Sequence, residues 1–224
     1  MHARVGVTLC ALILGLPGPA AAAFVEGARS PSFGAPPRER LFAEPIVWRP
    51  SRALGTPWSG RLLGAVRLPS EGLYFFTWDP VLKQSPNRAW RRWGSERLVR
   101  VVLGVLADFA AAHPFAPRIG VGDLSRPRGG EFGRRFGGLG HVSHQNGLDV
   151  DVYYPRRDGT ERPPARPNQI EPRLAQELVD RFVAAGAVKV FVGPSTSLHG
   201  PPRVVQKLTR HDNHLHLRLA ATDR

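Results

Sequence analysis

The chain has 224 residues, enough for one good-sized domain and short for two. Leu, Ile, Val and Phe make up about 27% of it, above the roughly 20% below which a chain cannot build a core, which excludes a wholly disordered protein. Lysine and arginine number 31 against 18 acidic residues, which gives a net charge of +13 and a pI near 11.4. A surface this basic favours polyanionic partners, and charge alone leaves nucleic acid, anionic lipid and anionic cell-wall polymers open.

The N-terminus has the pattern of an export signal. Arg4 supplies a short positive region, residues 5–16 are apolar, and a run of alanines ends at Ala23. The apolar stretch is too short for a membrane-spanning helix, and the small residues after it are typical of a cleavage site. The sequence therefore predicts a signal peptide over residues 1–23, with secretion across the inner membrane to the periplasm or cell wall.

Cleavage of this signal would remove Cys10, the single cysteine of the chain. The mature protein would then have neither a disulfide nor a thiolate ligand, although it is exported. No later segment approaches the 18 consecutive apolar residues of a membrane helix, so we expect no membrane span.

The rest of the chain predicts an arm followed by one folded domain. Residues 24–58 are rich in Pro and Arg and lack periodicity, which indicates an extended arm or linker. The domain is expected over residues 59–224. It begins with residues 61–76, which predict two short strands around a turn at 69–72.

Two helices and three further strands are expected after this turn. Ser95 can cap a helix over residues 96–112, and Pro172 can begin a second helix that ends before Gly186. Strands are expected over residues 148–154, 187–192 and 213–219, and a Gly-rich loop over residues 125–140. The predicted fold class is α+β, a mostly antiparallel sheet with flanking helices and long loops.

Five of the eight histidines fall in two short segments. Neutral imidazoles and carboxylates are the ligands that zinc prefers where thiolates are lacking, and a catalytic zinc site has about three protein ligands and one open position. Two such segments in one chain predict a metal site. The candidate residues are His141, His144, Asp149 and Asp151 in the first segment, and His211, His214 and His216 in the second.

Strand alternation selects among these candidates. On the predicted strand 213–219, His214 and His216 share one face while leucines occupy the other. One of these imidazoles can bind the metal while the other stands beside the reacting water. Asp149 and Asp151 share a face of the strand 148–154, and Asp149 either orients a ligand histidine or is a solvated strand carboxylate. Gly147 lets the chain turn between His144 and that strand.

These segments resemble the penicillin-insensitive murein endopeptidase family. That family is part of a wider group with lysostaphin, the D-Ala-D-Ala metallopeptidases and the hedgehog signalling domain, which share an H-x6-D segment and a downstream H-x-H. Here these are His144 to Asp151 and residues 214–216. The family adds a leading His, an SHQxGLD-like context and an H-x2-H-x-H ending, matched by His141, residues 143–149 and His211, and the upstream GDLSRPRGG at 122–130 also looks familial.

The resemblance implies a zinc peptidase that cuts peptidoglycan cross-links, such as the bond between D-Ala and meso-diaminopimelate. By position, His144, Asp151 and His216 would be the zinc ligands, and His214 would be the base or the stabiliser of the transition state. The implied roles of the other two histidines are weaker: His211 would assist, and His141 would line the site. Peptidoglycan, which carries carboxylates or phosphates, then becomes the expected partner of the basic surface, and nucleic acid does not.

Three rival functions remain. A non-catalytic, metal-stabilised wall-binding module is possible because the hedgehog group shows that this scaffold can lose catalysis, and the retained His214 argues against it. A D-Ala-D-Ala carboxypeptidase would need a pocket for a terminal carboxylate, which Arg126 or Arg128 could provide. A secreted metal-dependent nuclease is suggested by the charge and by residues 211–214, but the chain has no recognisable nucleic-acid motif.

Overall fold

A computed structural model describes residues 41–133 and 141–221. The predicted signal peptide, residues 24–40 of the predicted arm and residues 134–140 of the Gly-rich loop lie outside the described residues. Among the helices of the described part, none is both long enough and apolar enough to cross a membrane.

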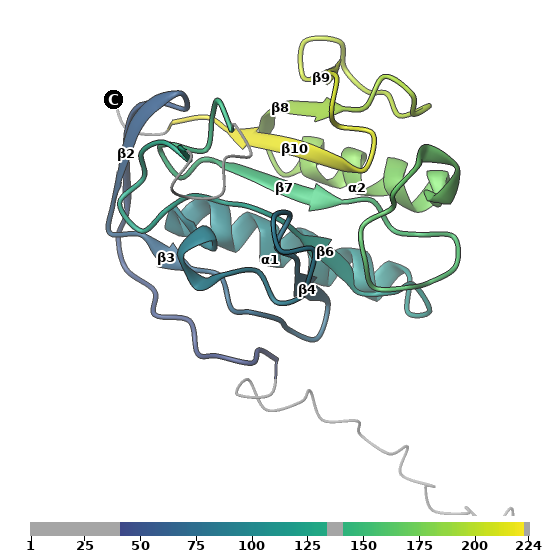
Figure 1. Ribbon diagram of the computed structural model, residues 1–224, viewed down its shortest axis with the longest axis horizontal. Coiled ribbons are helices and arrows are strands. Elements are labelled where there is room, and N and C mark those ends of the chain that lie inside the picture. The colour runs from purple at the N-terminus through teal and green to yellow at the C-terminus, as the bar shows by residue number, and fades with distance from the viewer. Residues whose placement is uncertain (1–40, 134–140, 222–224) are drawn as a thin grey trace, which may run out of the picture. The chain divides into compact units, whose positions relative to one another are not determined.

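The main element is a six-stranded mixed sheet with the strand order β4-β6-β7-β10-β8-β9 (Figure 1). Its strands are β4 (Phe75–Thr77), β6 (Ile119–Val121), β7 (Asp149–Tyr153), β8 (Ala187–Val192), β9 (Val205–Lys207) and β10 (His214–Leu219). The inner pairs β6/β7, β7/β10 and β10/β8 are antiparallel, whereas the edge pairs β4/β6 and β8/β9 are parallel. The α+β prediction with a mostly antiparallel sheet is confirmed.

Four short strands form two further sheets, both antiparallel. The strand β1 (Arg52–Thr56) pairs with β2 (Ser59–Leu63), and β3 (Val66–Arg67) pairs with β5 (Trp93–Gly94). The two strands expected around the turn at 69–72 therefore do not pair with each other, because β3 joins β5 and β4 joins β6.

The folded part of the chain begins before residue 59, within the segment predicted to be an arm. Besides β1, Phe42 forms a backbone bridge with Gly72, and Glu44 forms an ion pair with Arg92. These long-range contacts lie before residue 59, where the domain was expected to begin. Long-range contacts of this kind produce no periodic pattern of apolar residues in a short, half-exposed segment. The amino-acid sequence before residue 59 therefore did not indicate them.

The two helices match their predicted ranges closely. The helix α1 (Glu96–Ala112) starts after Ser95, whose Oγ accepts a hydrogen bond of 3.2 Å from the Leu98 N–H. The helix α2 (Pro172–Ala184) starts with proline, whose missing N–H costs nothing in the first turn. Gly186, just beyond its end, has a φ of +88°, a conformation that glycine adopts without strain.

Both helices pack on one face of the main sheet. Apolar side chains of both helices share a single buried core with those of the central strands β7 and β10. Full burial of each such side chain stabilises the fold by roughly 1.5–3 kcal/mol. The helix residues with the least exposure include Leu98, Leu106 and Phe109 of α1, and Leu178 and Phe182 of α2, packed with Val150, Val152, Leu215 and Leu217 of the sheet. Alternate residues of β7 and β10 consequently point to the opposite face.

Candidate metal centre

The pairing of β7 with β10 brings the two histidine segments together. In their antiparallel register, His216 lies opposite Asp151, Arg218 lies opposite Asp149, and His214 lies opposite Tyr153. Directly opposite residues have side chains on the same face of the sheet. The polar face predicted for β7 and the polar face predicted for β10 therefore join into one continuous face. This face is turned away from the helices.

A tight turn places His144 beneath this face. Its φ of +70° is unusual for a residue with a side chain, and Gly147 follows with a φ of +77° at a point where a Cβ would lie 2.5 Å from Leu62. The His144 ring is fully buried, and its Nδ1 donates a 2.6 Å hydrogen bond to the carbonyl oxygen of Leu124. The other ring nitrogen, Nε2, is then an acceptor in the neutral imidazole.

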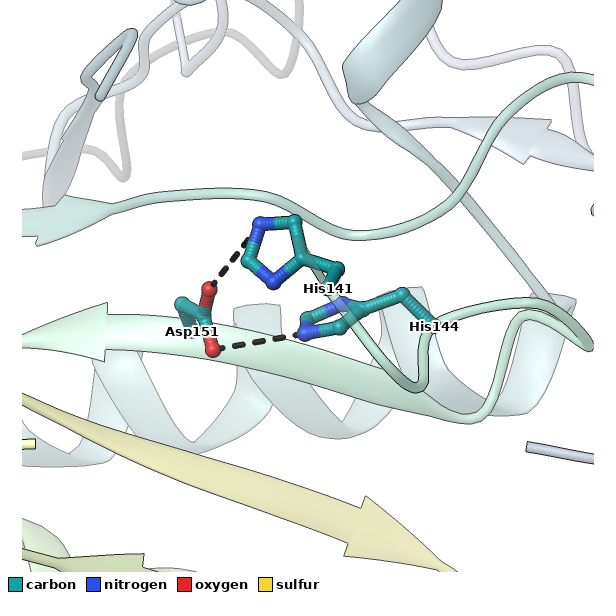
Figure 2. Close-up of side chains that lie close together, drawn as sticks. All are labelled: His141, His144 and Asp151. Carbon is teal, nitrogen blue, oxygen red and sulfur yellow. Dashed lines mark ion pairs between the residues drawn. The ribbon is translucent and has the colours of Figure 1, made fainter. Parts of the chain in front are cut away.

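The atoms that face each other here fit a metal ion. Nε2 of His144 lies 3.4 Å from Oδ1 of Asp151 (Figure 2), and both atoms are buried without a hydrogen-bond partner in the described part of the chain. Two buried acceptors in contact are costly unless a cation lies between them. Ligands at about 2.0–2.1 Å from a tetrahedral zinc ion lie about 3.3 Å apart, close to the observed separation.

His216 approaches the same carboxylate from β10. Its Nδ1 is 3.2 Å from Oδ1 of Asp151, and its Nε2 donates a 2.8 Å hydrogen bond to Oδ1 of Asp149. Asp149 also accepts a 2.7 Å bond from Nε of Arg218 and is fully buried, so it is not a solvated strand carboxylate. Burial lowers the pKa of His216, but the hydrogen bond to Asp149 and the adjacent negative charge of Asp151 outweigh burial and raise it to about 9.

His141 is oriented by a second carboxylate. Its Nε2 donates a 2.7 Å hydrogen bond to Oδ2 of Asp123, a fully buried residue that also accepts a 2.7 Å bond from Nε of Arg91. Burial raises the pKa of Asp123, but the bonds from Arg91 and His141 bring it down to about 2. In Figure 2 a dashed line joins His141 to Asp151, whose Oδ2 lies 3.9 Å from Nε2 of His141. One ligand atom from each of His141, His144 and Asp151 lies within 4.8 Å of the others. His141, which the sequence left without a definite role, is thus a candidate ligand.

His214 and His211 lie beside this cluster. Nε2 of His214 is 3.7 Å from Oδ1 of Asp151, and the ring of His211 is 4.8 Å from that of His214. Burial lowers the pKa of His214 most, and with Asp151 opposing and the imidazoles of His211 and His216 assisting, it reaches about 4. At neutral pH His214 is therefore an unprotonated imidazole. All seven candidate residues share one site, and the individual roles assigned to them stay predictions.

Three residues of the site were not found from the sequence. Asp123 lies in the GDLSRPRGG segment, which was noted as familial but received no role. Arg91 is fully buried against it, and nothing in a chain with so many arginines distinguishes this one. Phe132 packs edge-on against His141, with ring centroids 5.2 Å apart, and shields that side of the site from water.

Imidazoles and a carboxylate converge on one buried point, and a second hydrogen bond holds each of the rings of His141, His144 and His216. This is an arrangement that could hold a metal ion, as in metal-dependent hydrolases. The family model described as penicillin-insensitive murein endopeptidase matches residues 53–182, more than half of the chain. The chain therefore belongs to the penicillin-insensitive murein endopeptidase family, as the resemblance predicted, and is a peptidase that acts on peptidoglycan.

Two curated relatives carry the same description. A penicillin-insensitive murein endopeptidase of Yersinia enterocolitica is 26% identical over 216 residues, which are 85% of this chain and 73% of that protein. One of Pectobacterium atrosepticum is 26% identical over 203 residues, 79% of this chain and 67% of that protein. The region matched by the family model contains His141, His144 and Asp151 and ends before the second histidine segment.

Proposed function

We propose that this chain is a secreted zinc metallopeptidase that hydrolyses peptide cross-links of peptidoglycan, such as the D-Ala–meso-diaminopimelate bond. The observation that carries the metal is the contact between Nε2 of His144 and Oδ1 of Asp151, two buried acceptors 3.4 Å apart without a hydrogen-bond partner in the described part of the chain. The family supports the substrate class. The N-terminal pattern of residues 1–23 supports secretion.

The donor set favours zinc. Imidazole nitrogens and a carboxylate oxygen, without thiolates, are typical of catalytic zinc sites. His144, Asp151 and His216 would hold the ion, and His141 is a candidate fourth ligand. A zinc ion bound there supplies Lewis-acid polarisation of the scissile carbonyl and lowers the pKa of a water molecule in contact with it.

The side chains around the ligands support proton transfer and orientation. His214 is on the same face as His216, unprotonated at neutral pH, and can take a proton from the attacking water and pass it to the leaving amine. The Leu124 carbonyl selects the tautomer of His144 by accepting from Nδ1, and Asp149 does the same for His216 by accepting from Nε2. Each ligand histidine thus presents one definite nitrogen to the site.

The test uses the mature chain and purified cross-linked muropeptide dimers, with products analysed by mass spectrometry. We expect conversion of dimers to monomers, loss of activity in a strong chelator and recovery with added zinc. Penicillin should have no effect, because β-lactams acylate an activated serine and the chain has no S-x-x-K serine.

Two results would replace the proposal. Release of free D-Ala from uncross-linked pentapeptide, with dimers left intact, would indicate a carboxypeptidase. Binding of peptidoglycan without turnover, in protein that contains its metal, would indicate a wall-binding module.

A further inference from the structure

The β1–β2 hairpin is fixed against the loop that carries His144. The Gln145 N–H donates a 2.9 Å hydrogen bond to the carbonyl oxygen of Pro57 in the hairpin turn, and the Gly130 N–H donates one of 3.1 Å to Gly60. Gly60 approaches Asn146 so closely that a Cβ added to it would lie 2.7 Å from the Asn146 Cβ. In Figure 1 the hairpin stands beside the C-terminal end of β10. The tip of the hairpin is therefore held at one edge of the candidate metal centre.

Trp58, at this tip, faces Arg218 of β10. The Arg218 guanidinium carbon lies 5.8 Å from the centre of the Trp58 ring, and the Trp58 side chain is 57% exposed. An arginine over an aromatic face at this distance gains a weak attraction that also restricts the plane of the guanidinium. Both side chains of the pair are accessible to solvent, and Arg218 adjoins the site through its bond to Asp149.

Within residues 41–133 and 141–221, the guanidinium of Arg218 is anchored at one of its three nitrogens. Nε donates to Asp149, whereas neither terminal nitrogen has a hydrogen-bond partner among the residues that the structure describes. The Arg218 side chain is 17% exposed. Oδ1 of Asp149 accepts a hydrogen bond from Nε of Arg218 and another from Nε2 of His216. Arg218 therefore shares this oxygen with His216 and does not have it to itself. A half-buried guanidinium whose two terminal N–H₂ groups have no partner in the described part of the chain is suited to a planar oxyanion, above all a carboxylate held by two parallel hydrogen bonds.

The position of Arg218 on β10 indicates how far from the scissile bond a carboxylate bound to it would lie. Arg218 follows His216 by two residues on the same face of β10, a separation of roughly 6.5–7 Å between Cα atoms. Two residues of an extended peptide span about the same length. A carboxylate of a bound peptide would therefore reach Arg218 from within one or two residues of the bond that is cut.

We propose that Arg218, with its plane set by Trp58 and its Nε held by Asp149, binds a carboxylate of the peptide stem next to the scissile bond. The site then discriminates stems with a free carboxylate from stems in which that group is amidated. The proposal rests on the peptidase function proposed above and adds a specificity determinant to it.

The test compares two muropeptide dimers that differ only in a carboxylate or a carboxamide at the residue beside the scissile bond. For the unmodified protein we expect kcat/KM to favour the carboxylate by about 10-fold or more, since hydrogen bonds to charged groups are stronger than neutral ones. Arg218→Gln should bring this ratio close to one. Trp58→Ala should lower it by about 2–5-fold, the size of an exposed cation–π contact.

A second arginine–tryptophan pair supplies the matched control. Arg100 of α1 lies 4.0 Å from the ring centre of Trp48 and carries the same charge on a different element. Arg100→Gln removes one positive charge and should leave the substrate ratio unchanged. Zinc content is measured for every variant, so that loss of the metal is distinguished from loss of substrate binding.

Three outcomes separate the possibilities. Equal cleavage of both dimers by the unmodified protein would overturn the specificity role and leave the peptidase function intact, whereas cleavage of neither dimer would overturn the peptidase function. A loss of rate in Arg218→Gln that is the same for both dimers, with the ratio preserved, would show that Arg218 only positions Asp149 and His216. If Arg218→Gln does not fold, Arg218→Lys decides by the same ratio, because lysine keeps the charge but lacks the two-pronged geometry.

Discussion

The two histidines on β10 allow a sharp test of the proposed chemistry, because they differ in position by only two residues. Nδ1 of His216 is 3.2 Å from Oδ1 of Asp151 and its other nitrogen is held by Asp149, as expected for a ligand. Nε2 of His214 is farther from the same oxygen, at 3.7 Å, and its Nδ1 contacts Oδ1 of Asn213 at 2.7 Å. Replacing each histidine by alanine should therefore affect metal and rate differently.

His216→Ala should lose both zinc and activity, since it removes one of three or four ligands and leaves the buried Asp149 carboxylate with Arg218 as its one side-chain donor among the residues that the structure describes. His214→Ala should keep most of the zinc and lose about 10²-fold or more in kcat, the usual contribution of a general acid or base. A 10²-fold loss corresponds to about 2.7 kcal/mol of activation free energy.

The assay measures zinc by elemental analysis after dialysis, and kcat on cross-linked muropeptides. His199→Ala serves as the control, because His199 is exposed and lies outside the cluster. If His214→Ala empties the site while His216→Ala retains zinc, the two roles are reversed. If both variants keep zinc and full activity, the site is not the catalytic centre.

Two further predictions concern stability. Zinc that binds only the folded chain stabilises it by about 4 kcal/mol at a free zinc concentration 1,000 times Kd. A chelator should therefore lower the melting temperature, and added zinc should restore it. An unchanged melting temperature would contradict a bound metal. Burial raises the pKa of Asp79, but hydrogen bonds from Arg88, Leu82 and Val81 lower it below its ordinary value. The stability that this carboxylate contributes is therefore complete above about pH 5 and is lost as the pH falls through its lowered folded-state pKa. Urea midpoints of the unmodified protein and of Asp79→Asn should converge as the pH falls from about 5 to 3, and a constant difference would refute the assignment.

The two helices, and the candidate residues on β7 and β10, were predicted from the sequence alone. The spacing of apolar residues on one face set the bounds of α1, and Ser95 and Pro172 marked where the helices begin, because capping and proline geometry are local. Alternation on β7 and β10 likewise assigned aspartates and histidines to one face, since side chains in a strand have a period of two.

Only the tertiary structure decided how these faces meet and what surrounds them. The register that sets His216 opposite Asp151 joins residues far apart in the chain, and the parallel edge strands β4 and β9 are three residues long, too short for a periodic pattern. The role of Asp149 depended on its burial between His216 and Arg218, and that of Asp123 on its contact with Arg91. These are long-range contacts between single polar side chains. These contacts stabilise the site because the surrounding packing excludes water from them. Local sequence patterns do not show that packing.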